Sequence, residues 1–341
     1  MTKIFYTFIL LITCLTACGQ NKTNNQQSES EFYSATKNWF SAWELVSKDI
    51  YKIKKLSRVE FVFFDDKYVY STSNVTIKKG TPIKGPNLMN LNLNWEKALH
   101  SDSLTLPDSS VVSVKLMSFA SPISNDTNES FFIMPLPSYC EQKGITSKEL
   151  GLDKLITGVF LHEFSHSQQM QGFGEKITQF EKEYDIALSD DIVQDIFEKD
   201  TTYVKLYKKE VNYFYASVQG KSLNKEILRK GLAVMEKRQQ RYFIEKYKYL
   251  QQIDNFFLTM EGLGQYSMYL WLISPKGGNV KKEVAIKGIR RGKNHWSQDE
   301  GLALFLVLDK FTTPKTWAKN MFGEKTESVV TLIEKQITKK K

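Results

Sequence analysis

The segment His162-Glu163-Phe164-Ser165-His166 constrains this chain more than any other feature, because two histidines flank a glutamate at helical spacing. Residues four apart lie on the same face of an α-helix, one turn from each other. Both imidazoles can therefore point at one metal ion, while Glu163 stands close enough to hold a water beside it. The preceding residues 155–161 are mostly apolar, which predicts that this helix is buried.

An incidental pair of histidines is the simplest alternative, because short motifs also match by chance. The chain has only four histidines, however, and two of them stand in this motif. Two histidines and a glutamate are costly to bury without a partner. We therefore predict a metal site at His162 and His166. Two imidazoles, a carboxylate and one open position are typical of catalytic zinc, so Zn²⁺ is the expected ion.

A catalytic zinc site needs a third protein ligand, and three acidic residues come into consideration. Another histidine is disfavoured, because only His295 follows the motif and it stands in a Lys/Arg-rich loop. Asp185 follows the motif by 19 residues (185 − 166), within a charged segment. Glu300 ends an S-x-x-E pattern that is typical of a helix cap. Glu261 stands alone in an apolar helix and has no such explanation, so we favour it as the ligand.

The pairing of HEFSH with a later E-G-x-(G/A)-x-Y motif resembles the gluzincins, HExxH peptidases whose third zinc ligand is a glutamate. Residues 261–266, EGLGQY, fit this motif with a glycine in place of the usual alanine. Residues 300–305, EGLALF, fit it with a phenylalanine in place of the tyrosine. The stretches MEGLGQY and WSQDEGLALFLVLD are also similar to a group of bacterial proteins without an established substrate. The resemblance implies Zn²⁺ held by His162, His166 and Glu261.

The resemblance also implies a peptidase that hydrolyses peptide bonds with a zinc-activated water. Glu163 is the expected general base, which takes the proton of the water and passes it to the leaving amine. Tyr266 is a candidate oxyanion donor, because it follows Glu261 by about a turn and a half of helix. His295 is another candidate, and a packing or surface role is the alternative for both. In zincins an edge strand beside the active helix binds the substrate, and we expect residues 131–136 to be that strand.

The N-terminal residues predict export and a lipid anchor. An apolar run at residues 4–15 follows a lysine and is too short to span a bilayer, which indicates a signal peptide at residues 1–17. The tetrapeptide LTAC at residues 15–18 resembles the lipobox of bacterial lipoproteins, in which the Cys18 thiol carries the lipid. Residues 18–31 are polar and typical of a flexible tether. We expect an exported, membrane-anchored lipoprotein of the outer membrane that faces the periplasm or the surface.

Two regions of different pattern follow the tether, and together they predict the α+β class. Residues 32–145 predict one helix and a small sheet, and residues 146–341 predict almost only helices around the metal site. We expect the two regions to form one catalytic unit with the zincin-like fold that the resemblance implies. The expected strands are 59–64, 67–76, 111–119 and 131–136; the expected helices are 31–53, the HEFSH helix up to 172–174, 190–219, 223–257, 258–273 and 297–311.

The charge of the chain does not indicate a nucleic-acid partner. Its net charge of +9 comes from scattered residues, and no basic stripe interleaved with aromatic side chains is present. The expected partners are a peptide or protein substrate and the membrane that holds the N-terminal lipid. One alternative is a non-catalytic surface lipoprotein that binds peptide or glycan and keeps a structural or relict metal site, and a closed four-ligand site would favour it. Hydrolysis of a non-peptide amide is a further possibility.

Overall fold

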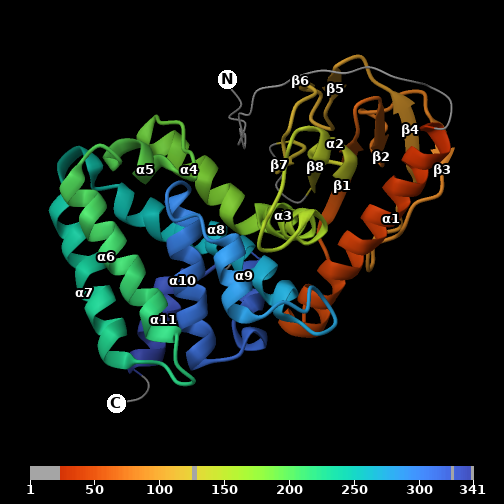
Figure 1. Cartoon of the computed structure of the whole chain (residues 1–341). Coiled ribbons are helices and arrows are strands. Elements are labelled where there is room, and N and C mark those ends of the chain that lie inside the picture. The colour runs from red at the N-terminus through yellow and green to blue at the C-terminus, as the bar shows by residue number, and fades with distance from the viewer. Residues whose placement is uncertain (1–23, 125–128, 324–325, 339–341) are drawn as a thin grey trace. The chain divides into compact units, whose positions relative to one another are not determined.

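The computed structural model describes residues 24–124, 129–323 and 326–338, so the expected signal peptide, Cys18 and the tether up to residue 23 lie outside the described residues. The fold is mixed α+β, with a small sheet followed by a helical C-terminal region, as the sequence predicts (Figure 1). The described residues form two compact units, one with residues 24–171 and 267–288 and the other with residues 172–266 and 289–338. The HEFSH helix belongs to the unit that holds the sheet, so the division comes after residue 171 and not near residue 145.

The first unit is built on a six-stranded sheet with the strand order β3-β4-β2-β1-β8-β7. The neighbouring strands β1 and β8 run parallel, and all other neighbours in this sheet run antiparallel. The six strands are β1 Arg58–Phe64, β2 Tyr68–Ser71, β3 Thr81–Ile83, β4 Trp95–Leu99, β7 Phe119–Pro122 and β8 Glu129–Pro135, while β5 Ser103–Thr105 and β6 Val111–Ser113 form a separate two-stranded sheet.

The strands at 59–64 and 131–136 are confirmed within two residues at each end. The strand expected at 67–76 ends earlier, at Ser71, because Ser73 Oγ accepts a hydrogen bond from the backbone N–H of Val75 and turns the chain. The strand expected at 111–119 is two strands, because its ends pair with different partners: β6 pairs with β5, and β7 pairs with β8.

The helices of the first unit are α1 Asn24–Glu44, which continues as a π-helical segment at Leu45–Tyr51, α2 Pro137–Gln142, α3 Leu152–Ser167, the last part of α8 (Leu250–Ile273) and α9 Lys282–Ile289. The helix expected at 31–53 is thus confirmed up to Tyr51, but it begins earlier, so residues 24–31 of the expected tether are helical. Tertiary contacts that composition cannot reveal hold this start: Glu29 pairs with Lys97 at 3.0 Å, and Glu31 accepts from the backbone N–H of Ser138 at 2.7 Å.

The aromatic core of the first unit packs α1 and α3 against one face of the sheet. Phe160 of α3 stacks on Trp39 of α1 with ring centroids 5.5 Å apart, and Phe164 stacks on Phe61 of β1 at the same distance. Such rings bury 150–250 Å² each, about the largest contribution a side chain makes to a core. Alternate residues of β1 and β8 point to the opposite face, into a second cluster of Val62, Phe64, Val69, Ile77, Leu104, Leu106, Met117, Phe119, Phe131, Ile133 and Tyr139.

The second unit is helical. Its helices are α4 Glu175–Tyr184, α5 Ile192–Phe197, α6 Thr201–Val218, α7 Lys225–Tyr242, the first part of α8, α10 Trp296–Phe311 and α11 Val329–Thr338. The helices α6 and α7 pack side by side, and α10 packs against α6 and α11 (Figure 1). None of the described helices is both long and apolar enough to cross a membrane.

Three expected helix boundaries are wrong. The helix at 190–219 is interrupted before α6, because the Asp200 side chain accepts from backbone N–H groups and caps α6. The break expected after residue 257 does not exist; it lies between Tyr242 and Leu250, where Phe243 and Ile244 leave the helical conformation. The HEFSH helix ends at Ser167, and a π-helical turn over residues 170–174 leads directly into α4.

Candidate metal centre

The helix α3 carries the HEFSH motif and presents two faces of different chemistry. Phe160 and Phe164 pack on the sheet side, as described above. His162 and His166 follow them by two residues each, which turns a side chain by about 200° around a helix. The histidines therefore lie on the face of α3 that points away from the sheet. His162 is 4% exposed and Glu163 8% exposed, so both are buried as the sequence predicts.

The two histidines face each other at the distance that a shared ion requires. His162 Nε2 and His166 Nε2 are 3.2 Å apart. Two nitrogens bound to one tetrahedral zinc at about 2.0–2.1 Å would be about 3.3 Å apart. His166 Nδ1 donates to the Gln169 side-chain oxygen at 3.0 Å, which leaves Nε2 of that ring without a proton and able to bind a metal.

The last part of helix α8 packs closely on α3 within the first unit. Ser267 of α8 shares hydrogen bonds with Tyr51 at 2.9 Å and with Ser165 of α3 at 3.4 Å. Gly158 of α3 leaves the room that Met268 fills, because a Cβ at Gly158 would be 2.3 Å from Met268 Cε. The position of α8 along α3 is therefore fixed at these residues.

Glu261 lies six residues before Ser267 on this continuous helix and is only 3% exposed. One carboxylate oxygen of Glu261 and one ring nitrogen each of His162 and His166 all lie within 4.8 Å of one another. These three residues are a candidate metal-binding group, and they are the three that the sequence predicts. Nitrogen and oxygen donors of this kind suit a divalent first-row ion with one position left open.

A pair of buried glutamines, which the sequence analysis did not single out, orients the carboxylate of Glu261. Gln298 of α10 donates its amide N–H to Glu261 Oε2 at 3.3 Å, and Gln265 donates to Gln298 Oε1 at 2.8 Å. The helices touch beside this chain of hydrogen bonds, because a Cβ on Gly262 would be 2.6 Å from the Cα of Gly301. Polar partners of this kind hold metal ligands in position. The signal that identifies Glu261, a polar residue in an apolar helix, applies to both glutamines as well.

Tyr266 does not share the environment of Glu261. Its hydroxyl donates to Asp309 Oδ1 at 2.8 Å, and its ring stacks on Phe305 with centroids 5.5 Å apart. Five residues along a helix turn a side chain by about 140°, so Tyr266 points away from the face of Glu261. The other oxyanion candidate, His295, pairs its Nδ1 with Asp191 Oδ2 at 2.7 Å, and this hydrogen bond raises the pKa of His295. A packing or surface role therefore describes Tyr266 and His295 better than the role of an oxyanion donor.

The other two candidate ligands also lie elsewhere. Asp185 is exposed and ends α4 with a left-handed backbone (φ 50°). Glu300 does not cap α10, because the helix begins at Trp296 and Ser297 is already inside it. Glu300 is instead 1% exposed, with Oε2 at 3.7 Å from a guanidinium nitrogen of Arg238.

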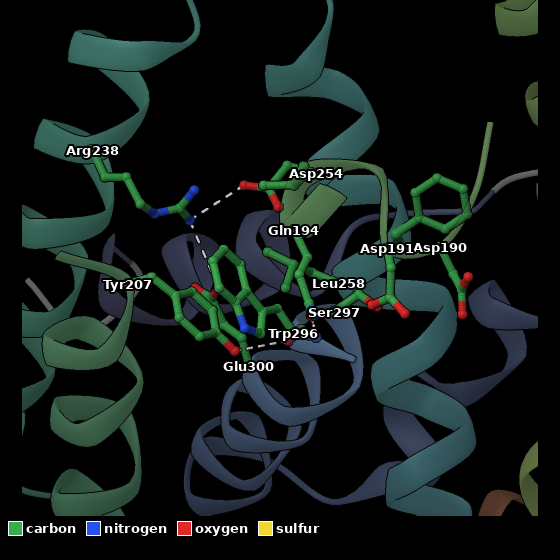
Figure 2. Close-up of a pocket in the computed structure, with 12 residues that line it drawn as sticks. Asp190, Asp191, Gln194, Tyr207, Arg238, Asp254, Leu258, Trp296, Ser297 and Glu300 are labelled. Atoms are coloured by element: carbon green, nitrogen blue, oxygen red, sulfur yellow. Dashed lines mark hydrogen bonds and ion pairs between the residues drawn. The ribbon is translucent and has the colours of Figure 1, made fainter. Parts of the chain in front are cut away.

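Glu300 belongs to a buried cluster in which three carboxylates surround one arginine. Arg238 of α7 donates to Glu210 of α6 at 2.6 Å and to Asp254 of α8 at 3.3 Å (Figure 2 shows Arg238 with Asp254). Burial raises the pKa of Glu210 to about 7, with Arg238 as the largest opposing influence. Burial and the neighbouring Glu210 raise the pKa of Glu300 further above its usual range. Folding therefore favours the protonated, neutral form of Glu300.

This proton makes the stability of the fold depend on pH. A carboxyl whose pKa is raised by folding stabilises the folded state below its unfolded pKa, and this contribution is lost as the pH rises through the folded pKa. We expect Glu300→Gln to have a higher free energy of unfolding than the natural chain, because the amide is neutral without a proton. The difference should grow from about pH 5 to about pH 8. Urea denaturation of both proteins at the two pH values measures this, and parallel pH dependences would contradict it.

Comparison of the chain with protein-family models, with curated proteins and with solved structures gives no match. The assignment of the site therefore rests on the residues of this chain alone. Their geometry establishes an α+β protein with a candidate metal-binding group formed by His162, His166 and Glu261.

Proposed function

We propose that this chain is a zinc metallopeptidase with a zincin-like fold, exported and held at a membrane by a lipid on Cys18. The observation that carries the proposal is the convergence of His162, His166 and Glu261 beside the buried Glu163. Zn²⁺ bound there would polarise a scissile carbonyl and lower the pKa of a water to near neutrality. The lipid anchor rests on the LTAC motif at residues 15–18.

In this proposal Glu163 is the residue that transfers the proton. The residue directly follows His162 on α3, so its carboxylate stands next to the ligand face without being one of the three ligands. It takes a proton from the attacking water and donates it to the departing amine nitrogen. Gln169 and Gln298 keep the ligand side chains in position, so that this transfer occurs at a fixed site.

The strand that binds the substrate is β7 in this proposal and not the expected strand at 131–136. That segment is β8, which pairs with β1 on one side and with β7 on the other and is therefore no edge strand. Among the described residues, β7 pairs with β8 only, and it packs beside α3. An extended peptide can add to such an edge through main-chain hydrogen bonds.

The identity of the third ligand gives a direct prediction. We expect Glu261→Ala to lower the bound zinc by one ion per chain, because two imidazoles alone hold the ion weakly. Glu300→Ala, in the second E-G motif, and Asp185→Ala are the matched controls and should leave that ion bound. Metal analysis of the dialysed proteins measures it. Retention of the ion by Glu261→Ala together with its loss in either control would show that the ligand is misassigned.

Peptide hydrolysis by the purified chain tests the function itself. We expect cleavage of a mixed peptide library, read by mass spectrometry, that stops when a zinc chelator is added and returns when Zn²⁺ is restored. Zinc binding without any cleavage would instead favour the non-catalytic lipoprotein, and spectroscopy of the cobalt-substituted protein would then show whether four protein ligands close the site.

A further inference from the structure

We infer that Asp190, Asp191 and His295 form a second site for a divalent cation, which shares no residue with the first. One ligand atom of each of the three residues lies within 4.8 Å of the other two. Among the described residues, this is the only other group of His, Cys, Asp or Glu side chains that meets this condition. One imidazole and two carboxylates are donors that zinc and related first-row divalent ions accept.

The three residues come from two segments that hydrogen bonds already join. Asp190 and Asp191 directly precede α5, and His295 directly precedes α10. The pair of His295 Nδ1 and Asp191 Oδ2, 2.7 Å apart, is one link. The second link is the backbone N–H of Trp296, which donates to the Gln194 side chain at 3.2 Å. An ion bound here would therefore hold the start of α10 to the start of α5.

The backbone at His295 supports a role for its side chain. His295 has φ 57° and ψ 62°, the left-handed conformation that costs a residue with a Cβ about 1–2 kcal/mol. Glycine would adopt this conformation without that cost. The imidazole is thus held next to the two aspartates although the left-handed backbone conformation is unfavourable for histidine.

The cavity beside the aspartates favours positive charge. Asp190 and Asp191 line a cavity of about 10 Å³ together with Asp254 and Glu300, and Arg238 is the one basic residue in its lining (Figure 2). A space of this size accepts one water or one ion. The second carboxylate oxygen of Asp191, Oδ1, is buried and has no hydrogen-bond partner among the described residues. An unpaired carboxylate oxygen beside so small a space attracts a cation.

Binding replaces one proton with a doubly charged ion, so the site gains one net positive charge. The proton that His295 and Asp191 share leaves for solvent, and the neutral imidazole donates its lone pair to the ion. No other bond changes. An ion that binds only the folded chain stabilises it by mass action, so zinc should raise the unfolding temperature through this site.

The test uses a chain from which the first site has been removed. We expect the double variant His162→Ala/His166→Ala to bind one Zn²⁺ per chain in equilibrium dialysis. Adding His295→Gln should weaken that binding at least tenfold, and adding Asp191→Asn should have the same effect. Asp195→Asn, an exposed carboxylate on α5, is the matched control and should leave the ion bound. Circular dichroism confirms that each variant is folded.

Two results would overturn the inference: the double variant binds no zinc, or His295→Gln binds zinc as tightly as its parent. Because the background lacks the first site, neither result depends on whether that site holds a metal. If the double variant does not fold, His295→Gln is introduced into the natural chain instead. His295→Gln must then lower the bound zinc by one ion per chain, and unchanged zinc content would rule the second site out.

Discussion

Glu163→Gln is expected to lower the rate of peptide hydrolysis by about 10²–10⁴-fold while the zinc content stays unchanged. The amide keeps the size of the side chain but cannot accept the proton of the attacking water. His162, His166 and Glu261, which form the candidate ligand group, are untouched. Steady-state kinetics on a peptide cleaved by the natural chain, with metal analysis of the same preparations, measures both quantities.

A second variant on the same helix controls for nonspecific effects. Asp153 is an exposed carboxylate in the first turn of α3, and Asp153→Asn should keep the full rate. Equal hydrolysis by Glu163→Gln and the natural chain would exclude Glu163 as the base. Loss of zinc from Glu163→Gln would mean that this residue helps to hold the metal and is not only a proton carrier.

The largest loss of stability is expected from Arg238→Ala. The guanidinium is 1% exposed and lies among Glu210, Asp254 and Glu300, which are all buried. Removing one partner of a buried ion pair costs about 3–5 kcal/mol, because the remaining charges stay buried without compensation. The carboxylates can take up protons at low pH, so the loss should be larger at about pH 8 than at about pH 5.

Urea denaturation measures this loss against a neighbour on α7. Lys237 is exposed and directly precedes Arg238, so Lys237→Ala should change the free energy of unfolding by less than about 0.5 kcal/mol. If Arg238→Ala also changes it by less than about 1 kcal/mol, the buried carboxylates do not depend on this arginine, and the cluster is not a determinant of the fold.

The parts of the molecule that local sequence determines were predictable. The strands β1 and β8 are apolar runs with β-branched and aromatic residues, and α3 and α10 are apolar helices, although α3 ends earlier than expected. Glu261 was predictable for a similar reason, since a lone carboxylate in an apolar helix needs a partner. The helical angle between Glu261 and Tyr266 could also have been calculated, and it argues against Tyr266 as an oxyanion donor.

The parts that depend on distant partners were not predictable. Arg238 lies in the highly charged segment KRQQR, which looks like an exposed helix face, and its burial follows from carboxylates on three other helices. Asp191 and His295 are 104 residues apart in the chain. Glu300 fitted a capping pattern that begins at Ser297. The structure shows that α10 already begins at Trp296, so Ser297 does not cap the helix.

The proposed function depends on a zinc ion held by α3 and α8, which anomalous diffraction at the zinc absorption edge would reveal. We predict a peak bounded by Nε2 of His162, Nε2 of His166 and a carboxylate oxygen of Glu261, with the remaining position open to solvent. A map with no peak among these three side chains would contradict the claim of a metal site. A peak closed by a fourth protein ligand would contradict the proposed catalysis.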